Sequence, residues 1–177
     1  NLFYSQAVYV AIGATVEDIV GNRITAANAT YTTGMDPSLE GYYPFNGNAE
    51  DLTSNGRNFT VYGNTSLTSG RDNSSNSAYY FDGNGDYLEY STSIPSLSRY
   101  TITLWAKPDS TGTYEAMFAS YNDASFGFQI DIDSSNNFHI RKGTSSGGNI
   151  TLSSATMGSW TFIAFTYDGT DSKCYIN

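Results

Sequence analysis

The stretch Tyr100-Thr-Ile-Thr-Leu-Trp-Ala106 alternates residue by residue, with Tyr100, Ile102, Leu104 and Ala106 falling on one side. Two later stretches, residues 126–132 and 162–167, show the same period of two. Successive side chains of a β-strand point to opposite faces of its sheet, so each stretch is predicted to be a strand with one face against a core. These three stretches favour an all-β fold.

Short strand-like segments recur at roughly ten-residue spacing from Glu40 to Asn177, with turn residues between them and no helical pattern. Many short strands without intervening helices predict an antiparallel sandwich or barrel. The expected strands are residues 41–45, 59–62, 78–81, 87–90, 100–107, 115–121, 127–132, 137–141, 149–152, 160–167 and 172–176.

Five segments within residues 40–177 follow one another in the order of a known family. They are Glu40-Gly-Tyr-Tyr-Pro-Phe-Asn-Gly-Asn-Ala-Glu-Asp51, Ser77-Ala-Tyr-Tyr-Phe-Asp-Gly-Asn-Gly-Asp-Tyr-Leu88, Tyr100-Thr-Ile-Thr-Leu-Trp-Ala-Lys-Pro108, Gly158-Ser-Trp-Thr-Phe-Ile-Ala-Phe-Thr-Tyr-Asp-Gly169 and Lys173-Cys-Tyr-Ile-Asn177. Together they resemble the laminin-G-like, concanavalin A-like jelly-roll β-sandwich. The expected large core anchors are Phe81, Leu88, Trp105, Trp160 and Phe165.

The family pattern normally continues past the final "Y-I-N" strand through a hairpin into three or four more strands. Asn177 falls where the first residue of an Asn-Gly hairpin turn would stand. We therefore expect the sandwich to be incomplete at its C-terminus, either because the sequence is a piece of a longer protein, which we favour, or because strands of a partner subunit complete the sheet.

Residues 1–35 differ from the remainder. Apolar residues from Ala7 to Val20 recur near helical spacing, which predicts a helix from about Ser5 to Ala27 that serves as a stalk or assembly segment. The alternation of Val8, Val10 and Ile12 would also suit a strand. A turn-rich linker containing Gly34 and Pro37 is expected to separate this segment from the sandwich.

Composition restricts the partners and the compartment. Aromatic residues make up 15% of the 177 residues and charged residues only 14%, so Ser, Thr, Asn and Gly must cover the surface, as in secreted and virion-surface β proteins. A net charge of −9 argues against nucleic acid and anionic membranes, and no apolar run approaches the roughly 20 residues of a membrane span. We expect an extracellular, cell-surface or virion-surface protein whose single Cys174 is a buried thiol.

The strand Gln129-Ile-Asp-Ile-Asp-Ser134 occupies the position of the glucanase motif E-[IL]-D-x-x-E of the same fold. Gln129 replaces the first carboxylate and Ser134 the last, whereas retaining hydrolysis needs two carboxyl groups about 5 Å apart. Asp131 and Asp133 are expected to lie solvated on an exposed face, and His139, the only histidine, to be a surface or packing residue. We therefore expect no catalytic residues.

Structural calcium is the cofactor that the resemblance implies. In the family the loop after the first strand often helps to hold a calcium ion, and this carries over to Asp51 and Asn55, although part of that site normally comes from the C-terminal strands. The segment Asp82-Gly-Asn-Gly-Asp86 resembles half an EF-hand loop, but without the rest of that loop it is expected to form a tight hairpin turn.

Binding of glycans by this fold uses aromatic rings and Asn or Asp side chains from loops. The candidates for carbohydrate binding are Tyr62, Tyr114, Tyr121 and Asn122. Five Asn-x-Ser/Thr sequons are candidates for glycosylation in a eukaryotic or archaeal secreted protein. They are Asn28, Asn58, Asn64, Asn73 and Asn149.

Two functions remain open from the sequence, with a third held as distant. The first is a non-catalytic surface-binding or adhesion module that contacts carbohydrate or a surface protein. The second is a structural subunit of an extracellular filament or virus particle that displays the jelly roll, with residues 1–35 in self-assembly. The third, a glycoside hydrolase or lyase, is retained only because one fold hosts many functions.

Overall fold

The structure is a computed structural model of the 177-residue chain. It describes residues 7–12, 27–32, 35–92, 97–109, 115–120, 128–142 and 150–177. All regular elements in these ranges are β-strands, and the described residues contain no helix that could cross a membrane. The chain is therefore an all-β protein.

The strands follow the expected spacing closely. They are β1 (Ala7–Ile12), β2 (Ala27–Thr32), β3 (Thr60–Tyr62), β4 (Ser66–Thr68), β5 (Ala78–Tyr80), β6 (Tyr87–Glu89), β7 (Tyr100–Ala106), β8 (Glu115–Ser120), β9 (Phe128–Ile132), β10 (Asn137–Lys142), β11 (Ile150–Ser154), β12 (Thr161–Tyr167) and β13 (Ser172–Ile176).

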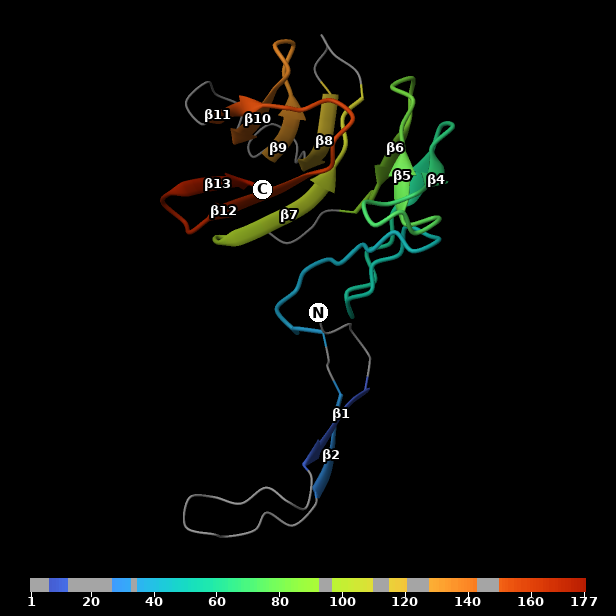
Figure 1. Cartoon of the computed structure of the whole chain (residues 1–177). Coiled ribbons are helices and arrows are strands. Elements are labelled where there is room, and N and C mark those ends of the chain that lie inside the picture. The colour runs from blue at the N-terminus through green and yellow to red at the C-terminus, as the bar shows by residue number, and fades with distance from the viewer. Residues whose placement is uncertain are drawn as a thin grey trace.

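Two antiparallel sheets face each other and form the sandwich (Figure 1). One has the order β11-β10-β9-β8 and the other the order β13-β12-β7. Strands β7 and β12 pair along their whole length, from Tyr100 opposite Tyr167 to Ala106 opposite Thr161. This register places the alternating apolar side chains of both strands on the face that meets the four-stranded sheet.

The core lies between these two sheets. Phe128 and Phe165 join them, with ring centroids 4.5 Å apart. Each fully buried side chain of this size contributes about 1.5–3 kcal/mol relative to exposure. The buried cluster comprises Phe128, Ile130, Ile132, Phe138, Ile140, Ile163 and Phe165.

Residues 35–92 form a separate corner beside the sandwich. The hairpin β4–β5 is nested between β3 and β6, which pair with each other from Thr60 opposite Glu89 to Tyr62 opposite Tyr87. Arg71, in the turn between β4 and β5, places its guanidinium 4.7 Å from the ring centroid of Trp105 on β7. This cation–π contact joins the corner to the outer face of the three-stranded sheet.

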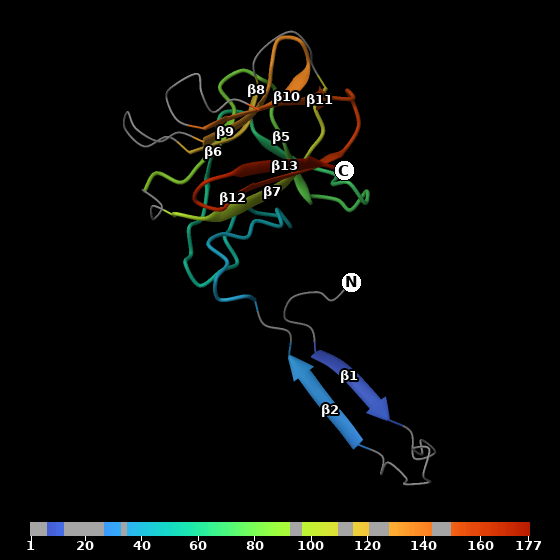
Figure 2. The ribbon, with the colours of Figure 1, turned by 90° about the vertical axis from the view of Figure 1, so that its left-hand side faces the viewer.

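The expected N-terminal helix is wrong for the residues that can be described. Residues 7–12 and 27–32 form β1 and β2, paired antiparallel from Ala7 opposite Thr32 to Ile12 opposite Ala27. Figures 1 and 2 show this hairpin apart from the sandwich. The strand alternation of Val8, Val10 and Ile12 prevailed over the helical spacing, and the remainder of the expected helix, residues 13–26, lies outside the described residues.

Two expected core anchors are also wrong. Trp105 and Phe81 are each 44% exposed, whereas Phe165 is fully buried and Leu88 and Trp160 are half-buried. Trp105 falls on the same face of β7 as Thr101 and Thr103, opposite the core-facing residues. Phe81 comes one residue after β5 ends, so no sheet orients its ring inward.

The strands of residues 35–92 differ from the predicted ones at two places. Residues 41–45 are not a strand, and β4 was not expected. In the first segment the backbone N–H of Tyr42 donates to the carboxylate of Asp51 instead of to a neighbouring strand. The Asp51 carboxylate thus takes the place of the backbone carbonyl that would accept from Tyr42 N–H in a β-sheet.

Candidate functional site

The glucanase-like strand is β9, and its central carboxylate does not lie on an exposed face. Asp131 is 0% exposed, which corrects the expectation of a solvated side chain. Gln129 donates from Nε2 to Asp131 Oδ2 at 2.8 Å, and Arg141 Nε lies 3.1 Å from the same oxygen. Asp133, at the end of the strand, accepts hydrogen bonds from the backbone of Ser135 and Asn137 instead.

His139 lies on β10, directly opposite Asp131 in the register. Its Nδ1 is 3.3 Å from Asp131 Oδ1 and accepts a hydrogen bond from Arg141 Nε at 3.2 Å. With that tautomer, Asp131 Oδ1 is buried and has no hydrogen bond among the residues that the structure describes. Burial raises the pKa of Asp131, and the positive charge of Arg141 offsets this effect only in part.

This arrangement lacks what retaining glycoside hydrolysis requires. An amide occupies the first carboxylate position, and the carboxylate that follows has no exposed surface. A nucleophile must reach the sugar, and a second carboxyl group about 5 Å away must act as acid and base. Asp131, Gln129, His139 and Arg141 form a polar cluster on the sheet in which Asp131 is fully covered.

Asp51 organises the loop that follows the first segment of the corner. Its Oδ1 accepts from the backbone N–H groups of Tyr42 (3.0 Å) and Thr53 (2.9 Å), and its Oδ2 accepts from Thr53 Oγ1 (2.9 Å) and the N–H of Arg57 (3.0 Å). Burial acts to raise the pKa of Asp51, but these four hydrogen bonds outweigh it and hold the pKa below its usual value.

The surroundings of Asp51 do not fit a calcium ion as they stand. Each carboxylate oxygen accepts two hydrogen bonds, so all four lone-pair sites are occupied by donors. Asn55 turns its Nδ2 toward the carbonyl oxygens of Leu39 and Glu40, at 3.4 and 3.2 Å. Among the residues that can be described, no cluster of three or more His, Cys, Asp or Glu side chains could hold a metal.

Tyr43 packs beside this loop. Its hydroxyl donates to the carbonyl oxygen of Arg57 at 2.8 Å, and its ring lies 4.2 Å from that of Phe59, centroid to centroid. Burial, with a contribution from the negative charge of Asp51, raises the pKa of Tyr43 to about 12. The loop is therefore held by internal hydrogen bonds and aromatic packing.

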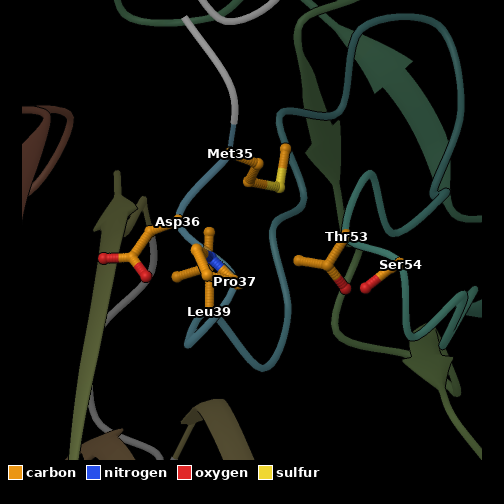
Figure 3. Close-up of a pocket in the computed structure, with 6 residues that line it drawn as sticks. All are labelled: Met35, Asp36, Pro37, Leu39, Thr53 and Ser54. Atoms are coloured by element: carbon orange, nitrogen blue, oxygen red, sulfur yellow. The ribbon is translucent and has the colours of Figure 1, made fainter.

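A small cavity of about 170 Å³ lies where the linker meets this loop (Figure 3). Its lining residues are Met35, Asp36, Pro37, Leu39, Thr53 and Ser54. The carboxylate of Asp36 points away from Thr53 and Ser54 in the view and is bound by the N–H and hydroxyl of Ser38. Sites for drug-sized ligands usually exceed about 300 Å³, so the cavity is a poor candidate for a sugar site.

The exposed ring pair of Tyr62 and Tyr87 is the better candidate. The two residues are register partners on β3 and β6, with ring centroids 4.5 Å apart and planes inclined by 13°. Tyr62 is 37% and Tyr87 48% exposed. The two rings stack on each other and each residue keeps part of its surface exposed, so aromatic surface is available for contact with a pyranose ring.

Asp86 fixes the backbone beneath the ring pair. Its Oδ2 accepts from the N–H of Asp82 (2.8 Å) and its Oδ1 from the N–H of Asn64 (2.6 Å), and these bonds, that of Asp82 first, lower the pKa of Asp86. Gly63 has φ +73°, and a Cβ there would meet Asp86 Oδ1 and the carbonyl oxygen of Gly85. The turn beside Tyr62 thus requires glycine.

The structure describes one of the four residues predicted to bind carbohydrate. Tyr62 is exposed as expected, while Tyr114, Tyr121 and Asn122 lie outside the described residues. Tyr87 was not predicted, because its pairing with Tyr62 spans the nested hairpin β4–β5 and leaves no signal in local sequence. The expectation that residues 82–86 form a tight hairpin turn is wrong, because the strands on either side of them pair elsewhere, β5 with β4 and β6 with β3.

Three of the predicted glycosylation sites can be located. Asn58, Asn64 and Asn73 are exposed, but Asn58 already accepts a hydrogen bond from the N–H of Asp51 at 2.9 Å. Asn73 stands in a turn with φ +63°. The side chain of Asn28 and all of Asn149 lie outside the described residues, and glycosylation stays a prediction for all five.

The facing antiparallel sheets and their apolar core define a β-sandwich of the lectin kind. Residues 82–177, more than half of the chain, match the family model of the concanavalin A-like lectin/glucanases superfamily. The chain belongs to this superfamily, which confirms the laminin-G-like resemblance over those residues. No curated protein and no solved structure matches the chain.

Proposed function

We propose that the chain is a non-catalytic, extracellular surface-binding module that contacts carbohydrate through Tyr62 and Tyr87. The exposed, parallel pair of tyrosine rings on β3 and β6 carries the proposal. Membership of a superfamily that includes lectins supports it, and so does a surface rich in neutral polar residues. Asp131, buried in its cluster with Arg141, supports the absence of catalysis.

A glycan array with the wild-type protein and the variants Tyr62→Ala and Tyr87→Ala tests this function. Each substitution should weaken glycan binding about tenfold, because aromatic anchors dominate such contacts. Tyr175→Ala is the matched control: Tyr175 is 54% exposed but lies on β13, and its loss should leave binding unchanged. The proposal fails if the wild type binds no glycan, or if all three variants behave alike.

A second candidate, a subunit of an extracellular filament or virus particle, is favoured by the hairpin β1–β2. Strand β1, Ala-Val-Tyr-Val-Ala-Ile, carries no charged or amide side chain, yet both views show it apart from the sandwich. A lone two-stranded hairpin is marginally stable in water, so β1 would gain from a cover supplied by another copy. Light scattering after size exclusion should then give an oligomer that becomes a monomer on removal of residues 1–35.

A further inference from the structure

The face of β3–β6 that carries the tyrosine pair also carries a carboxylate. Thr60 and Glu89 form the next register pair on the same face, because Val61 and Leu88 between them point to the other side. Glu89 lies about 7 Å along β6 from Tyr87, two residues at the rise of a strand. Its exposed side chain makes no hydrogen bond or ion pair with another residue that the structure describes.

The segment that carries this face has a strongly one-sided charge. Residues 35–92 contain eight Asp and Glu but only two arginines, which leaves −6 of the total of −9. Both arginines are engaged elsewhere: Arg57 Nη1 lies 2.8 Å from Glu40 Oε2, and Arg71 covers Trp105. A surface of this kind attracts cations and repels sulfate and uronate groups over about 10 Å at low salt.

The faces of tyrosine rings attract cations as well. An ammonium group within about 6 Å of such a ring is stabilised by the negative face of the ring. A ligand that lies on the outer face of the Tyr87 ring lies alongside β6, where Glu89 follows. The rings suit the flat side of a sugar, and Glu89 with the surrounding negative charge suits a positive group on that sugar.

We propose that this face binds glycans that carry protonated amino groups, in preference to neutral or acidic glycans. The inference rests on the proposed carbohydrate-binding function and names the ligand class of the same face. Stacking on Tyr62 and Tyr87 supplies the affinity for the sugar ring, and Glu89 discriminates for the ammonium group.

Titration calorimetry at pH 5.5 with a glucosamine hexamer and its fully N-acetylated counterpart tests the inference, because the two ligands differ in charge while sharing the sugar backbone. The amino hexamer should bind about tenfold tighter in 50 mM salt, and the difference should shrink at 500 mM salt as charges are screened. Tyr87→Ala should weaken the binding of both ligands. Glu89→Gln should weaken the binding of the amino hexamer several-fold and leave the binding of the acetylated hexamer unchanged.

Glu50→Gln is the matched control, since it removes the same charge from an exposed position of the same segment that is not part of β3 or β6. If Glu50→Gln weakens binding as much as Glu89→Gln, the face has no specific role and the inference is overturned. Equal binding of both hexamers also overturns it but leaves the carbohydrate function standing. If neither hexamer and no array glycan binds, both proposals fail, and if hexalysine binds as tightly as the amino hexamer, the site takes cationic peptides instead.

Discussion

The corner of residues 35–92 and the four-stranded sheet each bury one aspartate, and they treat it in opposite ways. Asp51 is 6% exposed and receives four hydrogen bonds from N–H and O–H groups, so its pKa is lowered. Asp131 is 0% exposed, and burial raises its pKa although Gln129, Arg141 and His139 lie beside it; among the described residues, one of its oxygens lacks a hydrogen bond.

The contrast teaches that burial alone does not fix the state of a carboxylate. Backbone N–H groups lie at fixed positions and suit the charged form without any partner charge. Side-chain partners on a sheet face supply charge but leave a lone pair open, and desolvation then dominates. The same residue type therefore has its charged form stabilised in the corner and destabilised in the sheet.

The largest expected effect is that of Asp51→Asn. The new amide would place N–H groups against the Thr53 hydroxyl and the Arg57 N–H, which are themselves donors. We expect a loss of about 3 kcal/mol in the free energy of unfolding, and a melting temperature lower by about 10 °C. Asp72→Asn is the control, because Asp72 is exposed and accepts its backbone hydrogen bond from the Ser74 N–H at the surface, and it should change stability by less than about 0.5 kcal/mol.

Asp131→Asn should lower the free energy of unfolding less than Asp51→Asn does, although the Asp131 side chain is more deeply buried. Its ionised form is penalised in the fold, and Arg141, which is 36% exposed, can turn to water when the charge is lost. We expect a change within about 1 kcal/mol by urea unfolding. A loss above about 3 kcal/mol would mean that the ion pair with Arg141 outweighs desolvation.

The pH dependence of stability should separate the two aspartates by sign. The folded pKa of Asp51 is lowered, so its contribution is present above the unfolded value near 3.9 and is lost as pH falls through the folded pKa. The folded pKa of Asp131 is raised, so its contribution is present below about 3.9 and is lost as pH rises through the folded pKa.

Urea unfolding of the wild type and both Asn variants between pH 2.5 and 7 measures this. The advantage of the wild type over Asp51→Asn should grow as pH rises, and its advantage over Asp131→Asn should shrink. If the free-energy differences from the wild type changed with pH in the same direction for both variants, the opposite pKa shifts of Asp51 and Asp131 would be contradicted.

The smallest expected effect is that of calcium. Because the lone-pair sites of Asp51 are filled, 5 mM CaCl₂ and 5 mM EDTA should give melting temperatures within about 1 °C of each other. A rise of several degrees with calcium, abolished by Asp51→Asn, would restore the predicted ion at Asp51 and Asn55.

The sandwich could be predicted because its strands carry a local signal. In β7, β9 and β12 a period of two coincides with burial against one core, so the sequence alone places them within a residue or two. Trp105 was wrongly predicted to lie in the core because of its size. Its position in the alternation places it on the outer face of β7. For Trp105, the position in the alternation predicts burial better than the size of the residue.

The candidate site was harder to predict, because it depends on contacts between distant segments. Tyr62 and Tyr87 meet only through the pairing of β3 with β6 across a nested hairpin. Three of the four donors to Asp51 are backbone N–H groups, which every residue except proline possesses and which no sequence pattern distinguishes. Asp131 looked exposed because its neighbours Ile130 and Ile132 face the core, yet side chains from β9 and β10 cover it.

The contact between Arg71 and Trp105 gives the chain an internal optical reporter. Only two tryptophans are present, and the indole of Trp105 lies against a cation that belongs to the other part of the molecule. Separation of residues 35–92 from the three-stranded sheet would withdraw that cation and shift the emission of Trp105. With Trp160 replaced by phenylalanine, fluorescence during denaturation would report the detachment of the corner separately from the melting of the sandwich.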